Sequence, residues 1–234
     1  MQSKVEKRVQ DKKWIWIMSL AVVAISANFW GFPVYLLDEA KNAGCAWEMF
    51  QRGDWVTPTF NGQLRTDKPP LHYFFMILSF KAFGVSAWSA RLFSVIMGLL
   101  TVAVVYYFTR KLTGERVAFL SGLVLASSVF VILEFHLAVP DPYFIFFLTL
   151  GWLSFAYAWE SGVSRYYYTC YAAVALAFMA KGPVAVALSG ATFLLFIVLR
   201  GEFRWSVLLR IKFFPGALIF LVLTAPWWVA VTLA

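Results

Sequence analysis

Residues 69–84 read PPLHYFFMILSFKAFG and decide how the chain threads a membrane. This block is about 15 residues long and contains Lys81, whereas a helix needs roughly 20 apolar residues to cross the hydrocarbon core. The basic joint 110–116, RKLTGER, follows after one further apolar block, and basic loops stay in the cytoplasm. If residues 69–84 crossed, that joint would lie outside. The sequence therefore predicts that residues 69–84 lie in the membrane interface or re-enter.

The composition is that of a polytopic membrane protein. Hydrophobic residues make up 62% of the 234 residues and charged residues 14%, with a mean hydropathy of +0.74. Soluble domains are about half apolar and a quarter charged, so a soluble enzyme, a secreted disulfide scaffold and a disordered tail are excluded. The net charge of +8 comes from short basic runs between apolar blocks. Such runs are typical of cytoplasmic loops, and no nucleic-acid surface is predicted.

The predicted fold class is an all-α polytopic membrane protein with about seven transmembrane helices and two interfacial helices in the first outer loop, residues 38–90. The crossing segments are 14–37, 91–109, 116–139, 142–159, both halves of 166–199, and 213–233. Lys181-Gly182-Pro183 divides the longest stretch, because the basic run after it must return to the cytoplasm. Residues 1–13 form a basic cytoplasmic N-terminus and residues 14–234 the membrane domain. The chain stops at the end of a span, which predicts a truncated sequence.

The first outer loop has local structure of its own. A surface helix is predicted to begin at the acidic pair Asp38-Glu39 and to end at Gly53. Its apolar positions recur at helical spacing and are Ala40, Ala43, Trp47 and Phe50. Asn61-Gly62 predicts a turn. Cys45 and Cys170 lie in different kinds of segment without paired spacing, and both are predicted to be free thiols.

Counting the crossings places six ionisable residues on one face of the membrane. They are Asp38, Glu39, Asp67, Lys68, Asp141 and Lys181. Ionisable groups at a bilayer are costly and are therefore candidates for function. Plainer interpretations stay open for each: Asp38-Glu39 as a helix cap, Lys68-Pro69-Pro70 as a rigid break, Asp141 as a turn residue and Lys181 as a hairpin tip.

Together these side chains suit a substrate that has a phosphate head and a lipid tail. Lys41, Lys68 or Lys181 could neutralise the phosphate, while a carboxylate takes a proton from an attacking hydroxyl. His72 and His136 lack paired metal spacing, and packing or interface roles are predicted for both.

At these residues the chain resembles a known family of membrane enzymes. The matching motifs are Leu37-Asp38-Glu39-Ala40 with Lys41, Gly53-Asp54-Trp55-Val56-Thr57-Pro58, Asn61-Gly62, Asp67-Lys68-Pro69-Pro70-Leu71, Asp141 and Lys181-Gly182-Pro183. The chain is similar to the C-type-fold glycosyltransferases that use polyprenyl-phosphate sugars. Within them it resembles the branch that contains lipid A aminoarabinose transferase and the protein O-mannosyltransferases. The family is longer, so the resemblance implies that this chain is the N-terminal membrane portion.

The resemblance also implies roles for the residues. Asp38 would be the general base and Asp141 the second acidic residue, with Glu39 beside them in the catalytic set. Lys68 would hold the lipid phosphate, assisted by Lys41 and Lys181. The family commonly has glutamate where this chain has Asp67, and that residue can bind metal. Asp67 is therefore the candidate ligand for a divalent ion, and no other cofactor is implied.

The predicted function is an inverting glycosyltransferase of the inner membrane. It would move a sugar from a polyprenyl-phosphate carrier to a glycolipid such as lipid A, or to a protein, on the periplasmic side. Two alternatives stay open. A secondary transporter for an anionic solute would use the same cations, but internal repeats and midplane charges are typical of such proteins. A non-catalytic membrane subunit or fragment is the other.

Overall fold

The computed structural model describes residues 13–35 and 37–234. Almost all regular structure in them is helical, as predicted, and the one sheet is a short hairpin of β1 (Thr59–Phe60) and β2 (Gln63–Leu64). The helices are α2 (Lys13–Ser26), α3 (Leu37–Arg52), α4 (Leu71–Phe83), α5 (Ala87–Thr113), α6 (Glu115–Ala126), α7 (Val129–Glu134), α8 (Asp141–Ser161), α9 (Arg165–Lys181), α10 (Val184–Leu199), α11 (Ser206–Arg210) and α12 (Phe213–Leu233). The predicted basic N-terminus lies, except for Lys13, outside the described residues.

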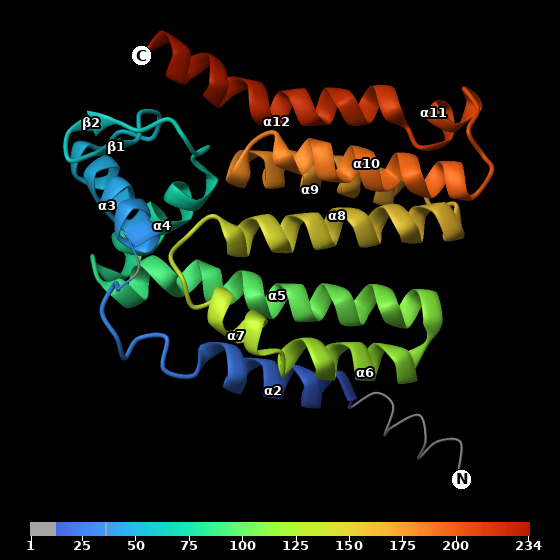
Figure 1. The fold of residues 1–234 in the computed structure, drawn as a ribbon, viewed down its shortest axis with the longest axis horizontal. Coiled ribbons are helices and arrows are strands. Elements are labelled where there is room, and N and C mark those ends of the chain that lie inside the picture. The colour runs from blue at the N-terminus through green and yellow to red at the C-terminus, as the bar shows by residue number, and fades with distance from the viewer. Residues whose placement is uncertain (1–12, 36) are drawn as a thin grey trace.

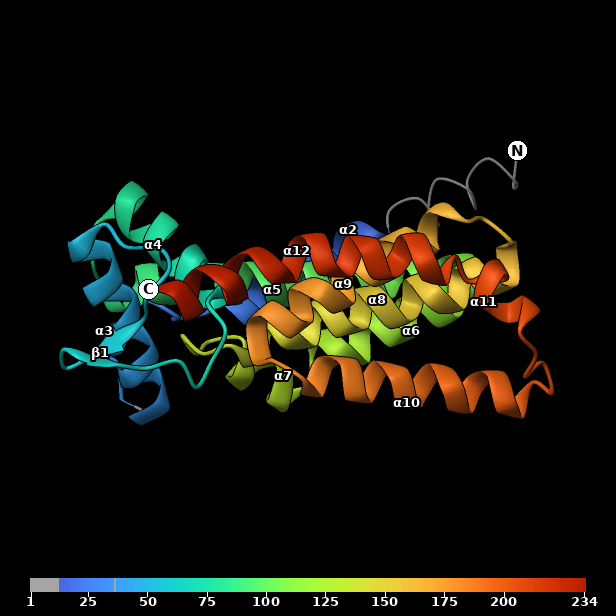
Figure 2. The ribbon, with the colours of Figure 1, turned by 90° about the horizontal axis from the view of Figure 1, so that it is seen from above.

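The long helices form a bundle that is capped at one end. Helices α2, α5, α6, α8, α9, α10 and α12 run along the long axis, and α8 packs between α5 and α9 (Figures 1 and 2). Helices α3 and α4 and the hairpin gather at the end where α8 and α10 begin (Figure 1). We call this the capped end. Helix α11 lies at the opposite end (Figure 1).

Three helices of the described chain, α5, α8 and α12, are long and apolar enough to cross a membrane. Helices α2, α4 and α10 are apolar but shorter, so the count of seven crossings stays a prediction. Helix α4 has 13 residues, which at about 1.5 Å per residue is too short to span the core. Its place beside α3 at the capped end agrees with the predicted interfacial helix.

Two predicted spans are wrong in their extent. The segment 116–139 is not one helix, because α6 ends at Ala126 and a separate short helix, α7, follows. Ser127 turns its hydroxyl back to the Leu123 carbonyl at 2.8 Å, and Ser128 has extended backbone with φ −70° and ψ 122°. Serine competes for backbone hydrogen bonds in this way and favours helix ends. The segment 14–37 is likewise helical only as far as Ser26.

The predicted turns are confirmed. Lys181 ends α9, and Gly182 reverses the chain with φ 77° before Pro183 precedes α10. Asn61 and Gly62 are the two loop residues of the hairpin and both have positive φ, 54° and 73°. Such a two-residue loop matches the twist of the flanking strands. Helix α3 ends at Arg52, directly before Gly53.

Candidate active site

The first polar pair at the capped end is Asp38 with Lys68. Asp38 lies in the first turn of α3 and its side chain is 51% exposed. The Lys68 ammonium donates to both carboxylate oxygens, at 2.9 Å each. Pro69 and Pro70, buried directly after Lys68, fix the backbone where α4 begins. A half-exposed carboxylate and a cation are therefore held together at the surface of the cap.

The second pair is Asp141 with Lys181. Asp141 is the first residue of α8 and Lys181 the last of α9, so the two helix ends meet at an ion pair. Both side chains are about one-third exposed, 30% and 38%. The Lys181 ammonium also lies 5.4 Å from the centre of the Phe144 ring.

The two pairs adjoin one another. Pro69 lies against Gly182, since a Cβ placed on that glycine would be 3.8 Å from the proline Cγ. Lys68 and Lys181 are the chain neighbours of these two residues. The structure thus brings both predicted acid–lysine pairs to one end of the bundle.

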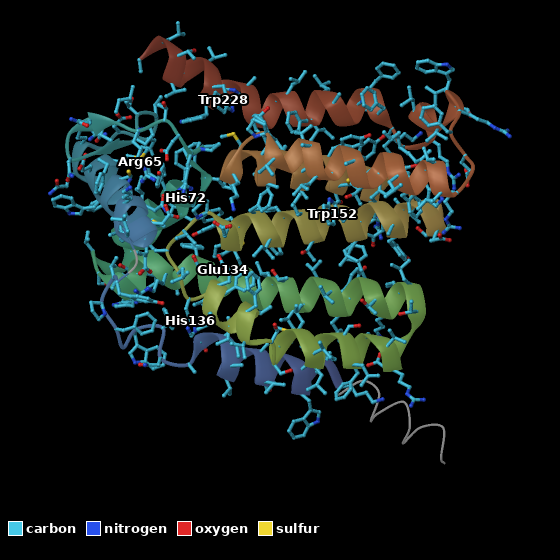
Figure 3. All side chains as sticks on the ribbon, in the orientation of Figure 1. Arg65, His72, Glu134, His136, Trp152 and Trp228 are labelled. Atoms are coloured by element: carbon cyan, nitrogen blue, oxygen red, sulfur yellow. The ribbon has the colours of Figure 1, made fainter. Side chains whose placement is uncertain are left out.

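A third carboxylate, Glu134, lies beside the second pair and was missed by the sequence analysis. It ends α7 at the capped end, in the part of 116–139 that follows the helix break (Figure 3). Burial raises the pKa of Glu134 above its usual value, and the negative charge of Asp141 raises it further, against a smaller opposing effect of Lys181. Its sequence position, inside an apolar block, carried no signal for this placement.

Glu39 differs from the other predicted catalytic residues because it is fully buried. The Arg91 guanidinium, also buried, contacts its two carboxylate oxygens at 2.6 and 2.8 Å. The backbone N–H of Ala138 donates to the same carboxylate at 3.0 Å. Arg91 further donates to the carbonyls of Phe32 and Pro33, at 2.7 and 2.9 Å. Glu39 therefore ties α3 to α5 and to the segment before Asp141, and it has no exposed surface for a substrate.

Arg65 is a second cation beside Asp38 that the sequence analysis did not single out. Its guanidinium lies 3.0 Å from the Asp67 carboxylate and 3.9 Å from that of Asp38. It also donates to the Cys45 sulfur at 3.5 Å. Lys41 is half-buried on α3, in the turn after Asp38, and makes no ion pair with any other described residue.

The residues around Asp67 do not fit a metal ion. Its carboxylate faces the fixed positive charge of Arg65, which repels a second cation. Metal sites in proteins are built from several carboxylate, imidazole or thiolate donors. Within residues 13–35 and 37–234, no group of three or more such side chains is close enough to hold a metal ion.

The two histidines and two cysteines behave as predicted. Both histidines are buried; His136 Nε2 lies 2.6 Å from the Ile25 carbonyl, and His72 contacts Asn42 inside the cap. Cys45 and Cys170 are buried free thiols.

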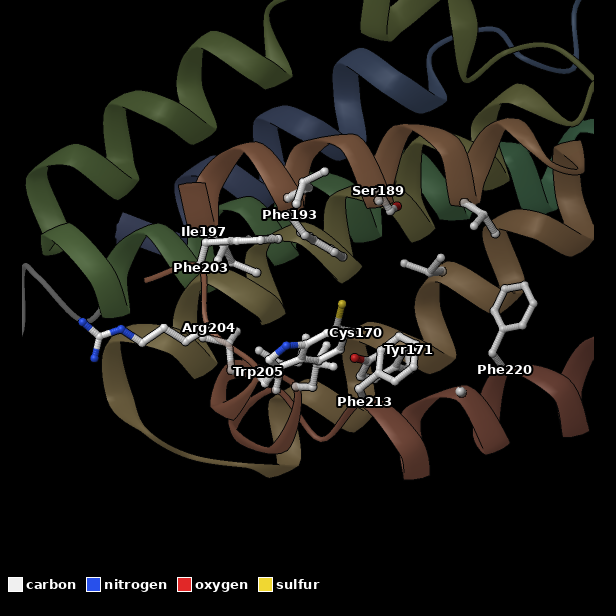
Figure 4. A pocket seen from close by; sticks show the side chains of 18 of the residues that line it. Cys170, Tyr171, Ser189, Phe193, Ile197, Phe203, Arg204, Trp205, Phe213 and Phe220 are labelled. Atoms are coloured by element: carbon white, nitrogen blue, oxygen red, sulfur yellow. The ribbon is translucent and has the colours of Figure 1, made fainter. Parts of the chain in front are cut away.

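A large cavity lies away from these polar pairs. It has a volume of about 700 Å³ and lies between α9, α10, α11 and α12, with Cys170, Phe193, Trp205 and Phe220 among its lining side chains (Figure 4). Among the described residues that line it, Arg204 is the one charged side chain and none is a carboxylate. The carboxylates of both acid–lysine pairs lie at the capped end instead.

Comparison with known proteins identifies the family. Residues 67–229 match the family described as dolichyl-phosphate-mannose-protein mannosyltransferase. The chain belongs to this family. The matched region includes Lys68, Asp141 and Lys181, and the resemblance inferred from the motifs is confirmed.

Individual relatives align with most of this chain. An uncharacterised protein of Aquifex aeolicus is 30% identical over 93% of this chain and 43% of its own length. The undecaprenyl phosphate-alpha-4-amino-4-deoxy-L-arabinose arabinosyl transferase of Pseudomonas savastanoi pv. phaseolicola is 30% identical over 85% of this chain and 37% of its own length. The chain thus spans less than half the length of these curated relatives.

Two crystal structures of ArnT from Cupriavidus metallidurans have the same fold. The apo structure has a TM-score of 0.87 and 25% identity, over 94% of this chain and 41% of that one. The structure bound to undecaprenyl phosphate has a TM-score of 0.81 and 27% identity, over 95% and 42%. The predicted fold class, a polytopic membrane glycosyltransferase fold, is confirmed.

Proposed function

We propose that this chain carries the part of a membrane glycosyltransferase that binds the donor phosphate and supplies the general base. The enzyme would move a sugar from a polyprenyl-phosphate carrier to a glycolipid such as lipid A, or to a protein, on the periplasmic face of the inner membrane. The observation that carries the proposal is the meeting of Asp38–Lys68 with Asp141–Lys181 at one end of an apolar bundle. The undecaprenyl phosphate bound by a protein of the same fold supports this substrate class.

Substrate binding would release the base. Lys68 engages both oxygens of Asp38, and an incoming phosphate competes for the same ammonium. Lys68 then holds the phosphate, with Arg65 and Lys41 as nearby positive charge. The freed Asp38 carboxylate accepts the proton of the attacking hydroxyl.

The reaction would be a single displacement. The acceptor oxygen forms a bond to the anomeric carbon while the bond from that carbon to the phosphate oxygen breaks. The proton passes to Asp38, and the lipid phosphate leaves. Because a phosphate leaving group needs electrostatic stabilisation rather than protonation, Lys68 and Lys181 hold its negative charge. Attack from the face opposite the leaving group inverts the configuration of the sugar.

Asp141, Glu134 and Glu39 would have different tasks. Asp141 holds Lys181 in place until the phosphate arrives, and with Glu134 it offers acceptors for sugar hydroxyls. Glu39, buried on Arg91, would position Asp38 and the segment before Asp141 without touching the substrate.

The test is sugar transfer by the full-length protein in proteoliposomes supplied with a polyprenyl-phosphate sugar and lipid A. Asp38→Asn and Lys68→Met are expected to lower turnover by at least about 100-fold, the usual effect of removing a catalytic base or charge stabiliser. Glu160→Gln is the matched control, because the Glu160 side chain is as exposed as that of Asp38 and forms an ion pair with Arg200 at the opposite end. Wild-type turnover in Asp38→Asn would remove the proposed base.

The transporter alternative is less well supported. Transporters of this kind bind their ions near the membrane midplane, whereas Asp38, Lys68, Asp141 and Lys181 lie at or before helix ends. Uptake of an anionic solute by the same vesicles, without sugar transfer, would favour the transporter over the glycosyltransferase.

A further inference from the structure

A buried polar cluster lies directly beneath the Asp38–Lys68 pair. Its members are Asn42 on α3 and His72 and Tyr73 on α4, all without exposed surface. Asn42 donates from Nδ2 to the Asp38 carbonyl at 2.8 Å. Its Oδ1 lies 3.2 Å from His72 Nε2 and 3.4 Å from the Tyr73 hydroxyl. The amide thus joins the backbone of Asp38 to the first turn of α4. We call this contact the inner tie.

The inner tie is electrically neutral. Burial lowers the pKa of His72 well below its usual value, and the positive charges of Lys68 and Arg65 lower it further. The neutral ring carries one proton. Since Asn42 uses Nδ2 for Asp38, its Oδ1 faces the histidine and can only accept, so the proton lies on Nε2. The backbone carbonyl of Pro69 also faces the ring and has a smaller, opposing effect on the pKa of His72.

The inner tie and the Asp38–Lys68 pair join the same two helix beginnings. Lys68 stands three residues before α4 and His72 is its second residue, while Asp38 and Asn42 lie one helical turn apart on α3. The outer connection is a half-exposed ion pair that a bound phosphate would break. The inner connection is buried and uncharged, so the charge of the same phosphate would not break it.

We propose that Asn42 and His72 are positioning residues, which hold Asp38 in register with Lys68 while the substrate separates their side chains. The inference rests on the proposed function. Its physical basis is the steep dependence of reaction rate on geometry, since a displacement of about 1 Å can cost about 100-fold in rate. Without the inner tie, α3 and α4 would be free to shift when the ion pair opens.

The first test uses imidazole ¹⁵N NMR of the purified full-length protein. His72→Gln removes the ring signals of His72 and thereby assigns them. We expect a neutral Nε2–H ring for His72 at pH 6, and the same signal in Lys68→Met, where the outer pair is absent. A charged ring, an Nδ1–H tautomer, or a signal lost in Lys68→Met would overturn the proposal. None of these readouts needs sugar transfer.

The second test separates positioning from packing by kinetics. Asn42→Leu and His72→Leu keep the volume but remove the tie, and each is expected to lower kcat by about 10- to 100-fold. The KM for the lipid-phosphate sugar should change by less than about threefold, because Lys68 remains. His72→Gln supplies a neutral donor and should restore most of kcat. The double variant should cost about as much as either single one, since both remove one interaction.

Ser79→Ala is the control for these variants, because Ser79 is equally buried on α4 and its hydroxyl has no partner among the described residues. It should keep wild-type kcat. A full kcat in His72→Leu, a loss that His72→Gln fails to rescue, or additive costs in the double variant would overturn the positioning role. If the wild type transfers no sugar while the NMR expectations hold, the proposed function fails and the inner tie remains a structural connection between α3 and α4.

Discussion

Pro69 packs against Gly182, and this contact joins the two halves of the candidate site. A Cβ built on Gly182 would lie 3.8 Å from Pro69 Cγ, an ordinary van der Waals distance. The glycine has φ 77° and ψ −152°, a backbone conformation that side chains disfavour. The chain therefore reverses next to Pro69, which brings the residue after Lys68 against the residue after Lys181.

Gly182→Ala should lower both stability and activity, although there is room for the methyl group. The cost is the backbone conformation, of order 1–3 kcal/mol for such a residue, and relief of that strain would move Lys181. Thermal unfolding in detergent and transfer activity measure the two effects. Gly190→Ala is the control: Gly190 lies inside α10 with nothing within 4 Å of the added atom. It should be neutral or slightly stabilising, and equal losses in both variants would contradict the strain argument.

Glu39→Ala should lower the free energy of unfolding strongly. It leaves the buried Arg91 guanidinium without its carboxylate, and breaking a buried pair in this way costs about 3–5 kcal/mol. Glu202→Ala is the comparison, because its pair with Arg210 is more than 40% exposed on both sides and is worth up to about 1 kcal/mol. Denaturation midpoints of the two variants in one detergent should differ clearly. Similar midpoints would show that Arg91 finds sufficient partners in the Phe32 and Pro33 carbonyls.

The sequence predicted the outer features of the site better than its interior. The α9–α10 reversal, the surface helix α3 and the shared end of Asp38 and Lys68 follow from charge placement and turn residues, which are local signals. The Glu39–Arg91 pair does not, since its members lie 52 residues apart. An arginine at the end of a crossing segment is expected to extend its charged group into water. Only the packed cap shows that this one points inward.

The predicted spans were wrong for the same reason, because contacts between residues distant in sequence decide where a helix ends. Residues 116–139 have the length and hydropathy of one crossing, and two serines at 127 and 128 are ordinary inside a membrane helix. Whether they end the helix depends on what the following residues contact. Here the segment after the break packs against Glu39 through Ala138, and Glu134 is carried to the site as a consequence.

Stability should depend on pH through Glu134. Burial and the nearby Asp141 raise its pKa above the usual value of 4.5, so the folded chain binds this proton more tightly than the unfolded chain. The free energy of unfolding from this group is therefore greatest at low pH and falls as pH rises from about 4.5 through the folded-state pKa. Glu134→Gln removes that loss and should be more stable than wild type at pH 7, with the difference disappearing near pH 4. The measurement is the melting temperature of both proteins between pH 4 and pH 7. An unchanged or lower melting temperature at pH 7 would mean that Lys181 compensates the charge.

Both acid–lysine pairs should be accessible from the periplasm, whereas the basic loop after α10 should not. Cys45 and Cys170 are first replaced; they are buried, and burial raises the pKa of the Cys45 thiol, so the background reaction is small. Single cysteines then replace three exposed residues: Leu37 next to Asp38, Val184 next to the Lys181 reversal, and Phe203 at the opposite end. A charged thiol reagent added to intact cells should label the first two variants and spare Phe203→Cys until the membrane is opened. Labelling of Leu37→Cys with protection of Val184→Cys would place the pairs in different compartments, as a crossing by residues 69–84 would. The single-site mechanism would then fail, and the transporter alternative would become the better account.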